Sequence, residues 1–272
     1  MIKLYTPLKT ILATATLFIG INSIHAQEKV DKKETTETDT IVVSKSIKVT
    51  TEIGKKDYDD RGNKIKYPRV FGGLTFTRID WGFSRLIDNG SFTLGEDSKF
   101  LSYSKASNFG FDIAQFGVRA SDAVKFYVST GFEWNYLRLK KDIILTPDQS
   151  PLSYEESDIH YKKNVLTSTY LRIPLTFEWR GPSNHNGRRA KVAAGLMTGI
   201  LLKGSQRLKS SELGKQSIRD NYNLASFQYG AFTRVGFGSF ALFGKYYFND
   251  MFENSPEQKN LSNFTFGLTL GF

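Results

Sequence analysis

Alternation of apolar and polar residues dominates the chain from residue 68 onward, and it is clearest in the stretch Ser262–Phe272. The apolar face of this stretch consists of Phe264, Phe266, Leu268, Leu270 and Phe272. Its other face carries only small or polar residues, mostly Thr and Gly. A strand of this length with one apolar face and one small-residue face is typical of a tilted strand that crosses a bilayer. The pattern therefore predicts a transmembrane β-strand, which needs partners to close a barrel.

Upstream segments repeat this pattern. They are Val70–Phe83, Asn108–Arg119, Val124–Leu139, Val165–Arg180, Ala190–Lys203, Ala225–Phe237 and Phe240–Asn249. In the first of these the parity changes near Arg78, which predicts a β-bulge or a twist there, and the second has a similar parity change near Ala114. Together with the last strand, which we expect to pair back onto Val70–Phe83, they predict an all-β fold. The expected fold is an eight-stranded antiparallel transmembrane up-and-down β-barrel over residues 68–272.

The connections between these segments alternate in length. Residues 86–106, 140–164 and 204–223 form long connections, 250–261 is intermediate, and 120–123, 181–188 and 238–239 are short. Long loops at one end and short turns at the other are typical of outer-membrane barrels, whose short turns face the periplasm. We therefore expect an outer-membrane protein of a Gram-negative bacterium with both termini in the periplasm. A soluble sandwich or lipocalin-like barrel, whose strands also alternate, is the alternative.

Large aromatic residues lie toward the ends of the predicted strands, on their outward faces. Two aromatic girdles, one at each membrane interface, would account for this placement. The residues predicted to form them are Trp81, Trp134, Tyr136, Phe177, Trp179, Tyr246, Phe248 and Phe272.

The first 67 residues differ from the barrel in composition. Residues 1–26 resemble a secretory signal peptide, with Lys3 and Lys9 ahead of an apolar stretch that ends near Ala26. An uncleaved N-terminal helix is the alternative, although the apolar stretch is short for a full span. Residues 27–67 are polar and contain few large apolar groups, so we expect a flexible periplasmic segment.

The charge balance is basic. Without the predicted signal segment, 35 Lys and Arg (37 minus Lys3 and Lys9) stand against 27 Asp and Glu, a formal charge of +8. The basic residues are scattered, and an exported protein has no access to nucleic acid, so we expect no nucleic-acid partner. The chain contains no Cys, which rules out disulfide bonds and a lipoprotein anchor.

Charged residues also fall on the inward faces of the predicted strands. The expected lumen charge network comprises Lys125, Glu133, Arg172, Glu178, Lys191, Arg234 and Lys245, and Lys203 shares the same inward parity. A polar pore or binding cleft is one interpretation. Because the interior of an eight-stranded barrel is only wide enough for its own side chains, a packed network of ion pairs is the favoured one.

Evidence for chemistry is weak. Ser157, Asp158 and His160 lie together in one long loop, but proximity in sequence does not make a catalytic triad. With His160 and His185 as the only histidines outside the predicted signal segment, and no Cys, we expect no metal site and no cofactor. We expect no enzymatic activity, with a loop-borne hydrolase or acyltransferase site as the alternative. The charged loops are instead candidates for contact with lipopolysaccharide or with an unknown extracellular or periplasmic protein.

Three motifs resemble those of the PorT-like outer-membrane β-barrel proteins of the Bacteroidota. They are S-T-Y-L-R-I-P-L-T-F-E-W (Ser168–Trp179), R-I-D-W-G-F-S-R-L (Arg78–Leu86) and F-T-F-G-L-T-L-G-F at the end of the chain. Arg85 departs from the Asn that is common at that position in one subgroup. The resemblance implies an integral outer-membrane barrel, and recognition of the last strand, with its Phe272, by the barrel assembly machinery.

The function that we expect is therefore that of a structural or interaction protein in the outer membrane, with the long loops as the partner-binding surface. A loop-borne enzyme and a narrow channel are alternatives. A role associated with protein secretion, as for the founding member of the PorT-like proteins, is a further alternative that the resemblance implies.

Overall fold

The computed structural model describes residues 67–76, 78–140 and 142–272. The predicted signal segment and all but Tyr67 of the predicted flexible segment lie outside these residues. The barrel strands are β1 (Arg69–Leu74), β2 (Ile79–Asp88), β3 (Leu101–Arg119), β4 (Val124–Leu139), β7 (Lys163–Ser183), β8 (Arg189–Lys209), β10 (Phe227–Phe237), β11 (Phe240–Tyr247) and β12 (Leu261–Leu270).

Smaller elements lie in the connections. They are β5 (Ile143–Leu145), β6 (Tyr154–Glu156), β9 (Lys215–Ile218) and the 3-10 helices η2 (Glu96–Ser98) and η3 (Pro256–Gln258). Within the described part of the chain, no helix has the length and apolar character needed to span a membrane.

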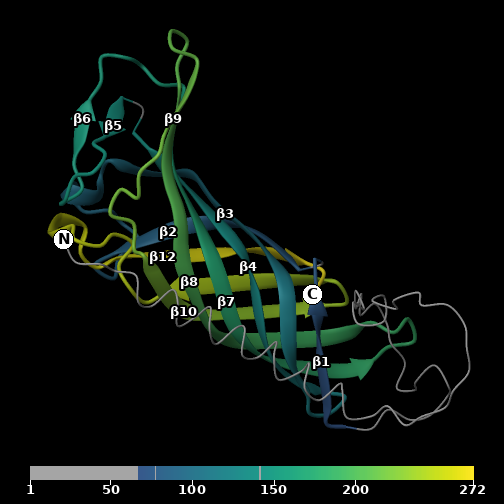
Figure 1. The fold of residues 1–272 in the computed structure, drawn as a ribbon. Coiled ribbons are helices and arrows are strands. Elements are labelled where there is room, and N and C mark those ends of the chain that lie inside the picture. Colours follow the sequence, from purple (N-terminus) through teal and green to yellow (C-terminus); the bar gives the residue numbers. More distant parts are fainter. Residues whose placement is uncertain (1–66, 77, 141) are drawn as a thin grey trace, which may run out of the picture. The chain divides into compact units, whose positions relative to one another are not determined.

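The sheet closes into an antiparallel barrel of eight strands (Figure 1). β1 and β2 count as one interrupted strand, because both pair with β3: Leu74 opposes Ala114 and Ile79 opposes Phe111. The parity change predicted near Arg78 lies at this interruption, and the one near Ala114 coincides with a register shift between Asp112 and Ala114. The predicted pairing of the last strand with Val70–Phe83 holds only for its second part: besides β11, β12 pairs with β2 and not with β1.

One predicted inward residue faces outward. Across β7 and β8, Thr169 opposes Lys203 while Tyr170 opposes Leu201, so Leu202 is an extra residue in β8. One extra residue moves every following side chain to the other face of a strand. Lys203 is consequently exposed on the outer face, and its predicted place in the lumen is wrong.

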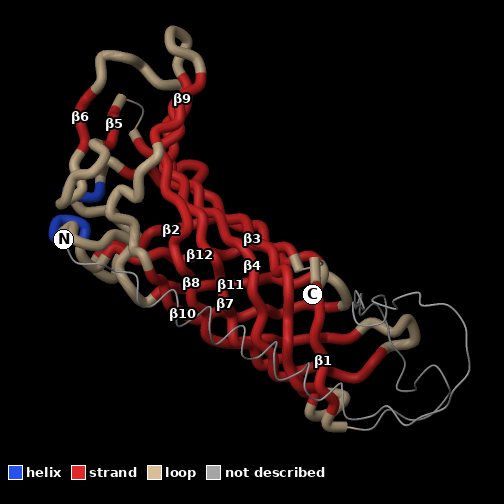
Figure 2. The backbone as a smooth tube through the Cα atoms, in the orientation of Figure 1, coloured by secondary structure: helices blue, strands red, loops and turns tan. Residues whose placement is uncertain are grey.

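The long connections gather at one end of the barrel and the short turns at the other (Figure 2). At the end with the long connections, the strands are joined by residues 89–100, 140, 142–162, 210–226 and 248–260, which we call the cap. A single apolar cluster joins the cap to the strand ends. It includes Leu86, Leu101, Leu137, Leu139 and Leu166 from the strands and Phe100, Ile143, Leu145, Leu152, Tyr222, Leu224 and Phe252 from the cap.

The aromatic residues predicted to form the girdles face outward, except for Phe272. Trp81, Phe177, Trp179 and Phe248 are exposed, and Trp134, Tyr136 and Tyr246 are half-buried. Gly271 has a φ of 76°, which turns the chain after β12, and the amides of Gly271 and Phe272 both donate to the Ser239 carbonyl. The Phe272 side chain therefore packs against Ala193 and Ala241, and its predicted place in a girdle is wrong.

The polarity of the two faces reverses along the strands that continue into the cap. In the middle of β7, Leu171 and Ile173 face outward while Arg172 is buried inside. Near its cap end, Leu166 is buried inside and Lys163 is exposed outside. The outward surface thus changes from apolar to charged along β7, which is expected where a barrel wall leaves lipid and enters water.

The seam between β2 and β12 depends on two glycines. Gly82 and Gly267 are directly opposite. A Cβ at Gly267 would lie 2.2 Å from the Trp81 carbonyl oxygen, and one at Gly82 would lie 2.8 Å from the Phe243 ring. Side chains at either position would therefore force the seam apart.

We expect Gly267→Val to weaken barrel closure, because overpacking costs about 1–3 kcal/mol of folding free energy. Each kcal/mol lowers the midpoint temperature of thermal unfolding by roughly 2–4 °C. The temperature at which the folded, fast-migrating gel band disappears should fall by about 5 °C. Leu268→Val, on the outer face of the same strand, serves as the control and should behave like the wild type. Equal midpoints for all three proteins would contradict this view of the seam.

Candidate functional site

Charged side chains fill the interior at mid-barrel, with Arg172 at their centre. Arg172 is 4% exposed. Its Nη1 donates to Asp80 Oδ2 at 2.7 Å, and its Nε and Nη2 donate to Asp112 Oδ1 at 3.1 and 2.8 Å. Since β7 is a neighbour of neither β2 nor β3 in the sheet, these bonds connect non-adjacent parts of the wall.

Two further cations extend the network toward β10 and β11. Arg234 Nη2 donates to Asp80 Oδ2 at 2.9 Å. Lys245 Nζ donates to Glu133 Oε2 at 2.9 Å and lies 3.5 Å from Asp80 Oδ2. Glu133 also accepts from the Tyr247 hydroxyl at 2.5 Å and from Asn108 Nδ2 at 2.9 Å. Each carboxylate therefore has several charged or polar donors, which is what a buried ion requires.

A second group of charges lies closer to the short turns. Glu178 accepts from the Tyr127 hydroxyl at 3.1 Å and from Arg180 Nε at 2.5 Å. Lys125 Nζ lies 5.1 Å from the centroid of the Phe71 ring. Lys191, which is half-buried, donates to the Phe272 carbonyl at 2.5 Å and lies beside its ring.

The structure thus places the seven residues of the predicted lumen network in the interior or at its rim. The sequence interpretation missed three members of the network, Arg78, Asp80 and Asp112. Two of them bind one another, since Arg78 Nη1 donates to Asp112 Oδ2 at 2.9 Å. All three lie beside the irregular stretches of the first two predicted strands, where parity could not be assigned. The available signal was chemical: a carboxylate inside an otherwise apolar strand must face the lumen.

The loop residues considered for catalysis are not assembled into a triad. His160 Nδ1 lies 2.8 Å from Asp142 Oδ1, with both side chains exposed. Ser157 Oγ accepts a hydrogen bond from the Ile159 amide at 3.2 Å. Among the described residues, no hydrogen bond joins Ser157 to His160, and Asp158 takes no part in either contact. Within the same residues, no group of three His, Cys, Asp or Glu side chains is arranged to hold a metal ion.

Two amides inside the barrel mouth hold the cap in place. Asn164 Nδ2 donates to the carbonyls of Lys140 and Ile143 at 2.8 and 2.6 Å. Gln206 accepts from the Leu145 amide at 3.0 Å and donates to Asn164 Oδ1 at 2.8 Å. These bonds fix β5 across the mouth, so the cap is a packed substructure rather than a set of independent loops.

The cap core also contains a buried phenol. Burial, reinforced by nearby Asp220, raises the pKa of Tyr222 to about 12. The Tyr222 hydroxyl donates to the Ile218 carbonyl at 3.4 Å, so this side chain serves the packing of the cap.

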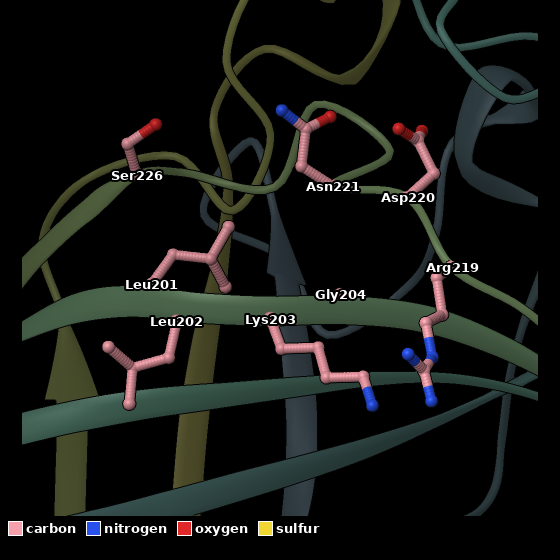
Figure 3. Close-up of a pocket in the computed structure, with 8 residues that line it drawn as sticks. All are labelled: Leu201, Leu202, Lys203, Gly204, Arg219, Asp220, Asn221 and Ser226. Atoms are coloured by element: carbon pink, nitrogen blue, oxygen red, sulfur yellow. The ribbon is translucent and has the colours of Figure 1, made fainter.

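An open pocket of about 410 Å³ lies where the connection from β9 to β10 passes β8 (Figure 3). Its lining residues are Leu201, Leu202, Lys203, Gly204, Arg219, Asp220, Asn221 and Ser226. In Figure 3 the side chain of Lys203 extends toward Arg219, whereas the carboxylate of Asp220 points away from both. The pocket is therefore cationic on one side, and it lies at the bulge that turns Lys203 outward.

We expect Arg172→Met to lower the free energy of unfolding by about 3–5 kcal/mol, because it leaves Asp80 and Asp112 buried without their main partner. Urea titration of the folded protein in detergent micelles measures this loss. Arg188→Met, in an exposed turn, should change stability by less than about 1 kcal/mol. The double variant R172M/D112N should be less destabilised than the sum of its single variants, since the two residues are coupled. Additive losses would contradict the network.

A family model described as "Outer membrane protein beta-barrel domain" matches residues 69–253. No curated protein and no solved structure matches the chain. The match covers the strands from β1 to β11, and the closed antiparallel barrel has the architecture that such a family requires. The chain therefore belongs to the outer membrane protein β-barrel domain family and is an integral outer-membrane protein.

Proposed function

We propose that this protein is a non-conducting outer-membrane barrel that presents a folded interaction surface, the cap, on the outside of the cell. The observation that carries the proposal is that side chains obstruct the barrel lumen at two levels. Ion pairs around Arg172 fill the barrel interior, and the apolar cluster of the cap lies across one mouth. A barrel that is filled in this way favours a structural or interaction role over transport.

The ordered cap supports an interaction role. A pre-formed surface loses less conformational entropy on binding than mobile loops do, which favours recognition. Charged side chains such as Glu155 and Glu156 of β6 are exposed on it. A partner that binds the cap would therefore meet a rigid and polar surface.

The proposed orientation, with the cap outside and both ends of the barrel chain in the periplasm, rests on the lengths of the connections. In outer-membrane barrels the short turns face the periplasm and the long loops face the exterior. Here the short turns follow β3, β7 and β10, and all the long connections lie at the cap end.

A membrane-embedded enzyme is the weaker alternative. It would need Ser157 and His160 to approach one another, whereas His160 pairs with Asp142 and the Ser157 hydroxyl accepts a backbone amide. We therefore expect no hydrolase or acyltransferase activity.

The finer assignment to the PorT-like proteins is supported by the segment Ser168–Trp179 in β7. Tyr170 in this motif donates to the Ala225 carbonyl at 2.9 Å, and Arg172 is the centre of the interior network. The motif thus serves the architecture, so it supports relatedness without implying the secretion role of the founding member. Recognition by the assembly machinery would involve the unfolded precursor, because Phe272 is buried in the closed barrel.

The orientation can be tested with single cysteines, since the native chain has none. We expect Glu212→Cys, in the tip beyond β8, to react with a membrane-impermeant maleimide on intact cells. His185→Cys, in the short turn between β7 and β8, should react only after the outer membrane is permeabilised. Both positions are exposed, so reactivity reports location. The reverse labelling pattern would overturn the orientation.

The closed lumen predicts that the purified protein gives no stable current steps in planar bilayers. A variant in which a short Gly/Ser linker replaces residues 143–161 should also be silent, because the ion network persists inside the wall. A large-pore porin in the same bilayers verifies insertion and detection. Reproducible current steps from the wild type would refute the non-conducting barrel, and steps from the loop-deleted variant alone would show that the cap is the main barrier.

A further inference from the structure

A set of basic side chains lies on the outward surface of β4, β7, β8 and β9, on the cap side of the apolar belt. This cationic face consists of Arg138, Lys163, Lys203, Arg207, Lys209, Lys215 and Arg219. All are exposed except Arg138, which is half-buried. The cap end of these strands projects beyond β10, β11 and β12 in Figure 1, so its outward surface is not covered by them.

The strand register arranges these cations in rows. Lys209 lies directly opposite Lys163 on one side and Lys215 on the other. In the next row toward the barrel, Val165 lies between Arg138 and Arg207. Like charges directly opposite one another on a sheet are destabilising. A row of three lysines is therefore a site at which an anion would be stabilising.

Few acidic side chains lie near the cationic face in the part of the chain that the structure describes. Among the described residues, none of its seven members forms an ion pair with an Asp or Glu. Between Lys203 and Ser226 the chain has two acidic residues, Glu212 and Asp220. Asp220 Oδ2 already accepts a hydrogen bond from the Tyr222 amide at 2.9 Å.

The surface directly below the cationic face is suited to acyl chains. Trp134, Thr169 and Lys203 form one row across β4, β7 and β8. The apolar row below it consists of Phe132, Leu171, Ile200 and Phe227. Tyr136 lies on the same face of β4 as Trp134, two residues closer to the cap. A Trp and a Tyr next to cations, above an apolar surface, are typical of a membrane interface.

From this succession of apolar, aromatic and cationic rows, we propose that the cationic face binds the phosphate groups of lipid A, the phosphorylated glycolipid of the outer leaflet. The acyl chains lie along the apolar rows, and the pocket beside Lys203 and Arg219 receives a phosphate at the level of the sugar. Arg and Lys hold phosphate through charge-assisted hydrogen bonds. In the cell this binding rests on the proposed orientation, which places the cap end in the outer leaflet.

The test uses purified full-length protein in non-ionic detergent, titrated with bisphosphorylated lipid A and with its dephosphorylated form by native mass spectrometry. The wild type should prefer the phosphorylated form. The variant K203Q/R207Q/R219Q, which removes two cations that line the pocket and their neighbour on β8, should bind it at least about tenfold more weakly, because each charge-assisted contact contributes strongly to the affinity. Raised salt should weaken wild-type binding in the same direction.

The matched control is K99Q/R188Q/K259Q, which removes the same charge from exposed positions outside the cationic face and should keep wild-type affinity. The gel shift on boiling verifies that both variants are folded. Equal affinity for the two forms of lipid A, or an equal loss in the control, would overturn the proposal. Because binding in detergent does not depend on orientation, the cysteine labelling fails or succeeds independently of this experiment.

Discussion

The structure depends on one constraint: the interior of an eight-stranded barrel is closed, narrow and lined with charges, so each charge must be paired inside it. Arg172 meets this constraint by binding carboxylates on two strands, β2 and β3, that are not its neighbours. Arg234 and Lys245 approach Asp80 from β10 and β11. The ion pairs thus connect separate parts of the wall, and the barrel cross-section is fixed by electrostatics as well as by backbone hydrogen bonds.

The same pairing limits what the protein can do. The charged side chains around Arg172 bind one another across the lumen, and an apolar cluster joins the cap to the strand ends above them. For this reason we propose that function lies on the surfaces outside the lumen, which are the polar cap and the outward face of the projecting strands.

Periodicity predicted the strands and their faces wherever the alternation was unbroken, as in Val124–Leu139, where the structure agrees residue by residue. It failed where one residue was inserted or the chain turned. Lys203 was misplaced by the extra residue in β8, and Phe272 by the left-handed Gly271. Asp80 and Asp112 escaped for the same reason, since they flank irregular stretches. The cap core could not be predicted, because Leu145, Leu152 and Tyr222 are brought together by tertiary packing without any local period.

Along β4, β7 and β8 the apolar residues change from the outward face to the inward face, so the alternation also marks where the strands leave the membrane. On β4, Phe132 faces outward and Glu133 inward, whereas nearer the cap Leu137 is buried inside and Arg138 lies outside. On β8 the same exchange separates Leu196 from the pair Arg207 and Leu208. In the lipid-facing part of each strand the outward face is apolar and the inward face is charged, whereas beyond the membrane the arrangement is reversed. On β4 the change lies near Trp134 and Tyr136. A strand that kept its apolar residues on one face throughout could not both cross the membrane and support a folded cap. In lipid the charged residues, such as Arg172, must face inward, and in water they must face outward, which places the cations of the cationic face on the outer surface.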